Sequence, residues 1–201
     1  ETLASIDEQV LKDIIENYKP SILADLIGQL DTDDAAYILE NLDLQKRETL
    51  LNQIPNDAKN LIVQALEFPE MSAGRLMQRD YVAVPRYWNV GQVIDYLRRS
   101  IKVPDQFYAV FIVDPRHIPV GTVPLHKLMR SERKVVLSDI MTIDPVVVPV
   151  AMDQEDMAFL FEQYDLTSAP VVNSQNRLIG MVTVDDVVEV IQEEAEEDML
   201  K

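Results

Sequence analysis

One stretch of this chain occurs twice, and the duplication limits the folds open to it. The segment LMQRDYVAVP, which begins at Leu76, is echoed 64 residues later by IMTIDPVVVP, which begins at Ile140. Each copy continues with the apolar spacing of a helix, over 90–99 and 154–164, and then with a strand, a turn, a second strand and another helix. The later halves align at a spacing of 59, so the first copy has about five extra residues around 102–106. The pattern predicts two β-α-β-β-α units whose apolar strands are covered by helices.

A different repeat precedes these two copies. From Pro20 to Glu67 the sequence divides into four units of twelve residues: PSILADLIGQLD, TDDAAYILENLD, LQKRETLLNQIP and NDAKNLIVQALE. Three positions of each unit are apolar: Leu26, Ile38, Leu50 and Ile62; Ile27, Leu39, Leu51 and Val63; Leu30, Leu42, Ile54 and Leu66. This spacing gives each short helix an apolar stripe, and helices of this length need neighbours to be stable. We predict an all-α stack of five helices over residues 1–68, the first beginning at a capping box of Ser5 and Glu8.

Charge and composition disfavour several classes of function. The chain has 35 acidic and 18 basic residues and a formal net charge of −17, which argues against nucleic-acid binding because phosphate backbones require a basic surface. It has no cysteine and no serine-hydrolase, zinc-protease or P-loop motif, so we expect no enzymatic activity. It also has no apolar run of about 18 to 20 residues and no signal-peptide pattern, so we expect these residues to be soluble.

The acidic charge has two interpretations. Cations are its natural partners, but acidic charge also keeps a soluble domain monodisperse. On a helix predicted over about 185–200, Asp186, Glu189, Glu193 and Glu197 would line one face, and each like-charged pair costs about 0.2 to 0.5 kcal/mol. Bound Mg²⁺ would offset this repulsion, since it keeps several waters and takes one or two carboxylates at each site. The alternative is that residues 193–198 form a solvated charge run.

The residues at the end of the second copy resemble a CBS domain. They are the segment GMVTVDD, from Gly180 to Asp186, and the segment APVV at 169–172. With its echo this makes a tandem pair. The helical repeat, the segment from Glu70 to Met77 and the acidic end at 193–198 extend the likeness over essentially the whole chain, which is similar to the cytosolic region of MgtE magnesium channels.

This resemblance implies a fold of class α plus α/β. It consists of an N-terminal helical-repeat, superhelical domain (1–68), a first CBS domain (69–137), a second CBS domain (138–190) and the acidic end of a helix (191–201) that leads to a membrane domain. It also implies a homodimer at the cytoplasmic face of the membrane that binds Mg²⁺ at acidic surfaces between domains and so gates the pore of its own transmembrane domain. The metal-facing carboxylates that it implies are Asp33, Asp153, Glu155, Asp165, Asp186, Glu189, Glu194, Glu197 and Asp198.

Several of these acids have a second explanation. Asp33 belongs to the group 31–34 that begins a predicted helix, where acids cap amide groups and favour the helix dipole. Asp153 and Glu155 likewise begin a helix. Capping and cation binding can coexist in one side chain.

A rival function is the sensing of an adenine nucleotide such as ATP, which CBS pairs commonly hold. The resemblance implies that Thr183 and Asp186 would contact the nucleotide, whereas the first copy has Pro124 and Lys127 at the equivalent positions. A further alternative is that the helical stack recruits a protein partner on its concave surface.

Overall fold

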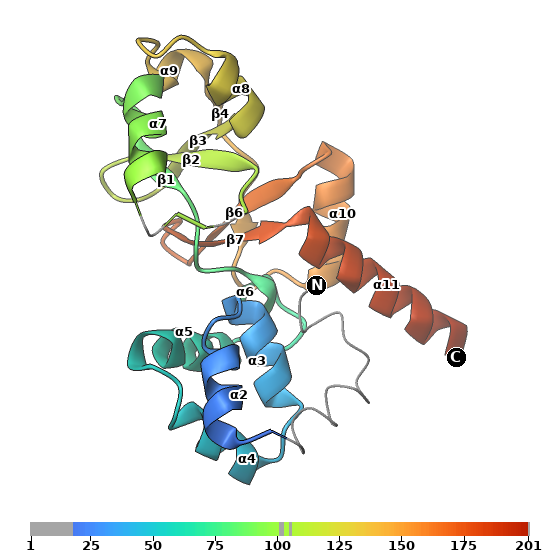
Figure 1. The fold of residues 1–201 in the computed structure, drawn as a ribbon. Helices are drawn as coiled ribbons and strands as arrows, with labels where there is room; N and C mark the ends of the chain where they lie inside the picture. The colour runs from blue at the N-terminus through green and yellow to red at the C-terminus, as the bar shows by residue number, and fades with distance from the viewer. Residues whose placement is uncertain (1–17, 101–102, 105, 201) are drawn as a thin grey trace. The chain divides into compact units, whose positions relative to one another are not determined.

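The structure is a computed structural model that describes residues 18–100, 103–104 and 106–200, with side chains as far as residue 192. The chain forms two compact units that divide after Glu70. Figure 1 shows the order of the helices and strands along the chain. None of the helices in the described part is both long enough and apolar enough to cross a membrane.

The first unit contains one helix for each twelve-residue repeat, which confirms the prediction for residues 20–67. The helices are α2 (Pro20–Ile27), α3 (Thr32–Glu40), α4 (Leu44–Leu51) and α5 (Asn56–Leu66). Each packs most closely against the helix two places along, α2 on α4 and α3 on α5. Their apolar stripes form one core around Ile27, Ile38, Leu39, Leu50 and Ile62. The predicted first helix and its capping box lie outside the described residues.

Two stripe residues of this repeat depart from the predicted burial. Leu26 is 43% exposed and Val63 is 37% exposed, whereas Ile38, Leu50 and Ile62 are buried. Leu26 lies on the first of the four described helices and Val63 on the last. Within the described part of the repeat, these two are the stripe residues that remain exposed to solvent.

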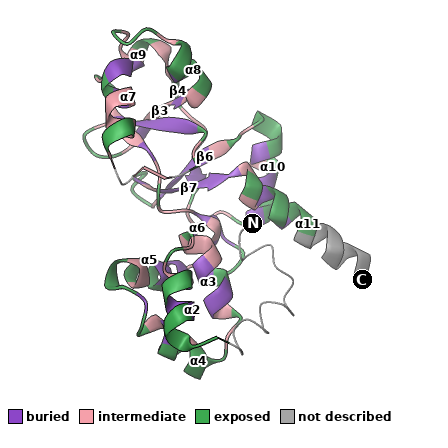
Figure 2. Cartoon of the chain, viewed as in Figure 1, coloured by how far each residue is buried: buried purple, intermediate pink, exposed green. Residues whose placement is uncertain are grey.

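The second unit contains two copies of the predicted β-α-β-β-α arrangement. The first copy is β1 (Ala83–Pro85), α7 (Val90–Arg99), β2 (Ala109–Val113), β3 (Pro119–Pro124) and α8 (Leu125–Arg130). The second is β5 (Val148–Pro149), α10 (Gln154–Tyr164), β6 (Ser168–Val172), β7 (Leu178–Thr183) and α11 (Val184–Leu200). In each copy the first strand runs parallel to the second, and the second runs antiparallel to the third. The strands are mostly buried, as the purple colour in Figure 2 shows.

The segment that precedes each copy packs on the other copy. The segment with α6 (Ala73–Leu76) binds the second copy, where Ala73 N donates to Met152 O (2.8 Å) and Gln78 N donates to Met181 O (2.8 Å). The segment with α9 (Leu137–Ile140) and β4 (Thr142–Ile143) binds the first copy, and β4 pairs with β3. This exchange explains why residues 71–201 form a single compact unit.

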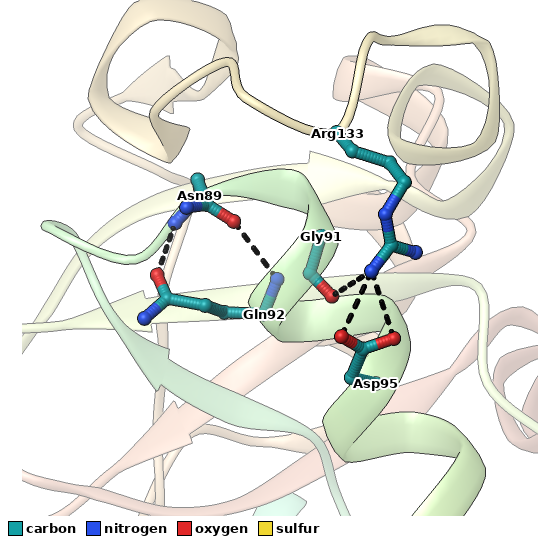
Figure 3. Close-up of polar contacts among 5 residues, drawn as sticks. All are labelled: Asn89, Gly91, Gln92, Asp95 and Arg133. Carbon is teal, nitrogen blue, oxygen red and sulfur yellow. Dashed lines mark hydrogen bonds and ion pairs between the residues drawn. The ribbon is translucent and has the colours of Figure 1, made fainter.

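Hydrogen bonds from Arg133 hold the segment between the two copies against the start of α7 (Figure 3). The Arg133 guanidinium donates to both carboxylate oxygens of Asp95, at 2.8 and 2.9 Å, and to Gly91 O at 3.4 Å. Asn89 and Gln92 form a capping box at the same helix end. The hydrogen bond from Arg133 holds the pKa of Asp95 below its ordinary value. The beginning of α7 is thereby fixed from two sides.

Equivalent glycines make the exchange of segments possible. A Cβ atom at Gly180 would lie 2.8 Å from the Gln78 carbonyl oxygen and 2.8 Å from Met77 Sδ. At Gly121, the equivalent position of the first copy, the nearest atom would be Met141 Sδ at 2.6 Å. Only a residue without a side chain allows the leading segment to approach β7 this closely.

We expect Gly180→Ala to lower the free energy of unfolding by about 1 to 3 kcal/mol, because the Gln78 backbone must move away from β7. Urea denaturation followed by circular dichroism would measure this. Gly121→Ala is the matched control and should cost less, since the Met141 side chain can turn aside and the nearest backbone atom, the Thr142 carbonyl oxygen, lies at 3.0 Å rather than 2.8 Å. Wild-type stability in Gly180→Ala would contradict the close approach.

Candidate functional site

The first turn of α11 holds two neighbouring carboxylates, and one of them closes the helix start. Asp186 Oδ2 accepts hydrogen bonds from Thr183 N (3.0 Å) and from Thr183 Oγ1 (2.8 Å). Thr183 directly precedes α11, so the Asp186 carboxylate reaches back to the N-cap amide as in one half of a capping box. The Thr183 side chain and backbone are only 5% exposed. The structure therefore brings together the two residues that the sequence singled out for nucleotide binding.

Opposing effects act on the pKa of the Asp186 carboxyl. Burial raises its pKa above the ordinary value, and the neighbouring Asp185 charge adds to this increase. The hydrogen bonds from Thr183 act in the opposite direction but do not cancel it. A charge at this position is therefore costly unless a cation approaches it.

The second carboxylate of the turn, that of Asp185, accepts a hydrogen bond from a residue of the first copy. Tyr108, which directly precedes β2, donates its hydroxyl to Asp185 Oδ2 at 3.0 Å. This hydrogen bond, together with the negative charges of Asp185 and Asp186, raises the pKa of Tyr108. Sequence reasoning missed Tyr108, because no motif links two residues that lie 77 positions apart.

Asp153 and Glu155 lie together at the start of α10. Asp153 is the N-cap, and its Oδ1 accepts a hydrogen bond from Glu155 N at 2.9 Å, which confirms the predicted capping role for this residue. Both side chains are exposed to solvent. The buried Gln154 between them donates its backbone N–H to Met71 O at 2.9 Å. The exchanged segment therefore anchors the helix end that presents these acids.

Asp165 lies at the opposite end of α10. It ends the helix in the left-handed conformation (φ 49°) and is exposed. Eleven helical residues separate it from Asp153, so the two lie about 18 Å apart along the helix axis. Ser168, the first residue of β6, pairs with Thr183, the last residue of β7. Asp165, just before β6, and the first turn of α11, just after β7, therefore lie at the same end of this strand pair.

The remaining predicted acids are more dispersed. Asp33 is half-buried in the first turn of α3, where its charge favours the helix dipole, and Glu189 is exposed on α11. The N-cap residue of α3, Asp31, makes no side-chain capping bond, so it is not the residue that fulfils the capping predicted for one member of the group 31–34. The side chains of Glu193, Glu194, Glu197 and Asp198 lie outside the described part. Within that part, no three acidic or histidine residues gather closely enough to hold one metal ion.

The first copy lacks a counterpart of the Thr183–Asp186 pair. Pro124 precedes α8, and it has neither a hydroxyl nor an N–H for a carboxylate to bind. Lys127 occupies the position equivalent to Asp186 and is exposed. The two copies therefore share a backbone but differ in chemistry at this position.

A helical repeat followed by two interlocked β-α-β-β-α copies defines a protein with an N-terminal helical domain and a tandem CBS pair. Residues 1–71 match the family model of the MgtE intracellular N domain, and residues 137–193 match the CBS domain model. The chain belongs to the MgtE family.

Individual relatives agree with this assignment. The magnesium transporter MgtE of Thermus thermophilus is 34% identical over 180 residues, which are 89% of this chain and 38% of that protein. The crystal structure of the soluble part of a magnesium transporter superposes with a TM-score of 0.90 at 28% identity, covering 96% of this chain and 76% of the other. The cytosolic domain of the Mg²⁺ channel MgtE in complex with ATP has a TM-score of 0.87 at 29% identity, covering 94% and 77%. The chain spans between 38% and 42% of the length of the curated relatives that it matches.

The raised pKa of Asp186 predicts a pH-dependent stability. Folding favours the protonated carboxyl, so the stabilisation is complete below the pKa of an unfolded aspartate and is lost as the pH rises through the raised folded pKa. We expect the free energy of unfolding of the wild type, relative to Asp186→Asn, to increase as the pH falls from about 7 to about 4. Urea denaturation at both pH values would test this, with Asp144→Asn as the reference for removing an exposed carboxylate. A difference independent of pH would contradict the prediction.

Proposed function

We propose that this chain is the cytosolic, magnesium-sensing regulatory region of a magnesium transporter or channel. In this proposal it has no catalytic activity of its own, lies at the cytoplasmic face of the membrane and is joined to a transmembrane domain whose pore it gates. Its membership of the MgtE family supports this role, since the relatives named above are magnesium transporters. The observation that carries the proposal is the set of carboxylates at the two ends of α10 and at the start of α11.

The donor chemistry of these acids suits Mg²⁺. Asp153, Glu155 and Asp165 are exposed carboxylates at helix ends, and the hydrogen bond from the Glu155 amide leaves acceptor capacity on the Asp153 carboxylate. Magnesium keeps much of its water shell and binds through one or two carboxylates. Such an ion needs only one or two acids from each surface that it joins, so dispersed acids are sufficient.

Ion binding of this kind can drive a conformational switch. Ions held between acidic surfaces bind the closed arrangement more tightly than the open one, and the equilibrium shifts by that difference in affinity. In the proposal Asp33 supplies the acid of the helical unit. The acids of the second copy and of the end of α11, including Glu189, Glu194, Glu197 and Asp198, supply the other surfaces.

We further propose that the chain acts as a homodimer through the apolar residues of α10 and α11. Phe159 is 65% exposed, and Val188 and Ile191 are also exposed on the helix that packs beside α10. Exposed apolar residues grouped in this way are typical of a protein interface. In the first copy Asp95, bound to Arg133, occupies the position equivalent to Phe159 (Figure 3), whereas the exposed Met129 stands at the position equivalent to Val188.

We expect the protein to become more compact as Mg²⁺ rises from zero to about 20 mM, because bound ions neutralise acidic surfaces that otherwise repel. Small-angle X-ray scattering would measure the radius of gyration, and its forward intensity would give the mass of the expected dimer. Potassium chloride of equal ionic strength controls for screening.

Neutralising the proposed ligands with Asp153→Asn and Glu155→Gln should raise the Mg²⁺ concentration at the midpoint by about threefold or more. The pair Asp57→Asn and Asp144→Asn removes the same charge elsewhere and should leave the midpoint unchanged. Equal responses to Mg²⁺ and to potassium chloride, or equal midpoints for the two pairs, would contradict the proposal.

A second candidate function is the binding of an adenine nucleotide such as ATP by the second copy. The buried Thr183 hydroxyl and the fixed Asp186 carboxylate support it, and the ATP complex of a similar MgtE domain favours it. This role can accompany magnesium sensing, since all the proposed magnesium ligands except Asp186 lie outside the Thr183–Asp186 pair.

We expect ATP to bind one site per chain in isothermal titration calorimetry. Thr183→Val should weaken binding by about tenfold, because the change removes a hydrogen bond and disturbs the Asp186 carboxylate. Thr122→Val, a change in the equivalent strand of the first copy, is the control. Equal affinity in wild type and Thr183→Val would exclude this site.

A further inference from the structure

We propose that Tyr108 is a positioning residue that holds the acidic first turn of α11 against the first copy. The inference rests on the proposed function, since it concerns how the acids of α11 are arranged for cations. Its basis is the hydrogen bond from the Tyr108 hydroxyl to Asp185 Oδ2 at 3.0 Å.

The backbone of Tyr108 is itself well fixed. Its carbonyl oxygen accepts a hydrogen bond from Leu125 N at 2.9 Å, at the junction of β3 and α8, and Ala109 begins the fully buried strand β2. The hydroxyl therefore extends from a rigid part of the first copy. A donor with a fixed origin restricts where the Asp185 carboxylate can lie.

Two adjacent carboxylates are thus held by partners in different copies. Thr183 of the second copy binds Asp186, and Tyr108 of the first copy binds Asp185. The negative charges of Asp185 and Asp186 repel one another, and these hydrogen bonds hold both carboxylates in place. Holding the turn in place before a cation arrives reduces the entropy lost on binding.

The two copies differ at this contact. At the equivalent positions stand Thr167 instead of Tyr108 and His126 instead of Asp185, so a tyrosine–aspartate pair is possible at only one of the two places. The helix held by the pair is α11, with 17 residues, whereas its counterpart α8 has six. The hydrogen bond between Tyr108 and Asp185 thus holds the helix that carries the acidic residues.

Tyr108→Phe tests the proposal, because it removes the hydroxyl and retains the ring. The Mg²⁺ midpoint for compaction should rise by about two- to fivefold in this variant and by a similar factor in Asp185→Ala, which removes the acceptor. The double variant should match the single ones, since both remove the same contact. Tyr81→Phe, which removes another tyrosine hydroxyl of the same unit, should leave the midpoint unchanged.

A spectroscopic measurement separates positioning from a general effect on stability. In protein labelled with ¹³C at tyrosine Cζ, the Tyr108 resonance, identified by its loss in Tyr108→Phe, should shift during Mg²⁺ titration with the same midpoint as compaction. Three results would overturn the inference while leaving magnesium sensing intact: an unchanged midpoint in Tyr108→Phe, additive effects in the double variant, or a Tyr108 chemical shift that does not change with Mg²⁺. If the wild type shows no Mg²⁺ response, the proposed function fails first.

Discussion

The exchange of leading segments between the two copies is the constraint on which the second unit depends. Each three-stranded core is extended by a segment from the other copy: β4 on β3, and Gln78 on Met181. Gly121 and Gly180 leave room for these segments, and Met77, which belongs to the segment against Gly180, is completely buried. Neither copy can therefore be removed without exposing the other, and cooperative folding of residues 71–201 follows from this arrangement.

The same exchange positions the acids of the second copy. The segment at Met71 and Ala73 binds the backbone at Met152 and Gln154, directly around Asp153. The residues that follow the helical unit in the chain thus form part of the support of a proposed cation surface. In the first copy, Arg133 and the segment around it support the start of α7 in the same manner.

The two copies share a backbone fold but differ in the charge of their side chains. Eleven of the 18 basic residues fall between 69 and 137, where there are six acidic residues, whereas 138–201 has two basic and 15 acidic residues. Lys127 replaces Asp186, and Asp95 replaces the exposed Phe159. The second copy is therefore the acidic one, and it exposes Phe159 where the first copy has Asp95.

Periodicity alone determined most of the fold. The twelve-residue spacing predicted α2 to α5, and the 64-residue echo predicted both copies with helices at Val90–Arg99 and Gln154–Tyr164, because apolar spacing directly reports which faces are covered. The motif GMVTVDD also singled out Thr183 and Asp186, which contact one another because both lie within one turn; their role toward a nucleotide stays a prediction. Tertiary structure alone decided the exchange of segments, the exposure of Leu26 and Val63, and the contact of Tyr108 with Asp185. These features depend on which surfaces meet after the chain folds, and residues that lie 77 positions apart leave no periodic signal of their meeting.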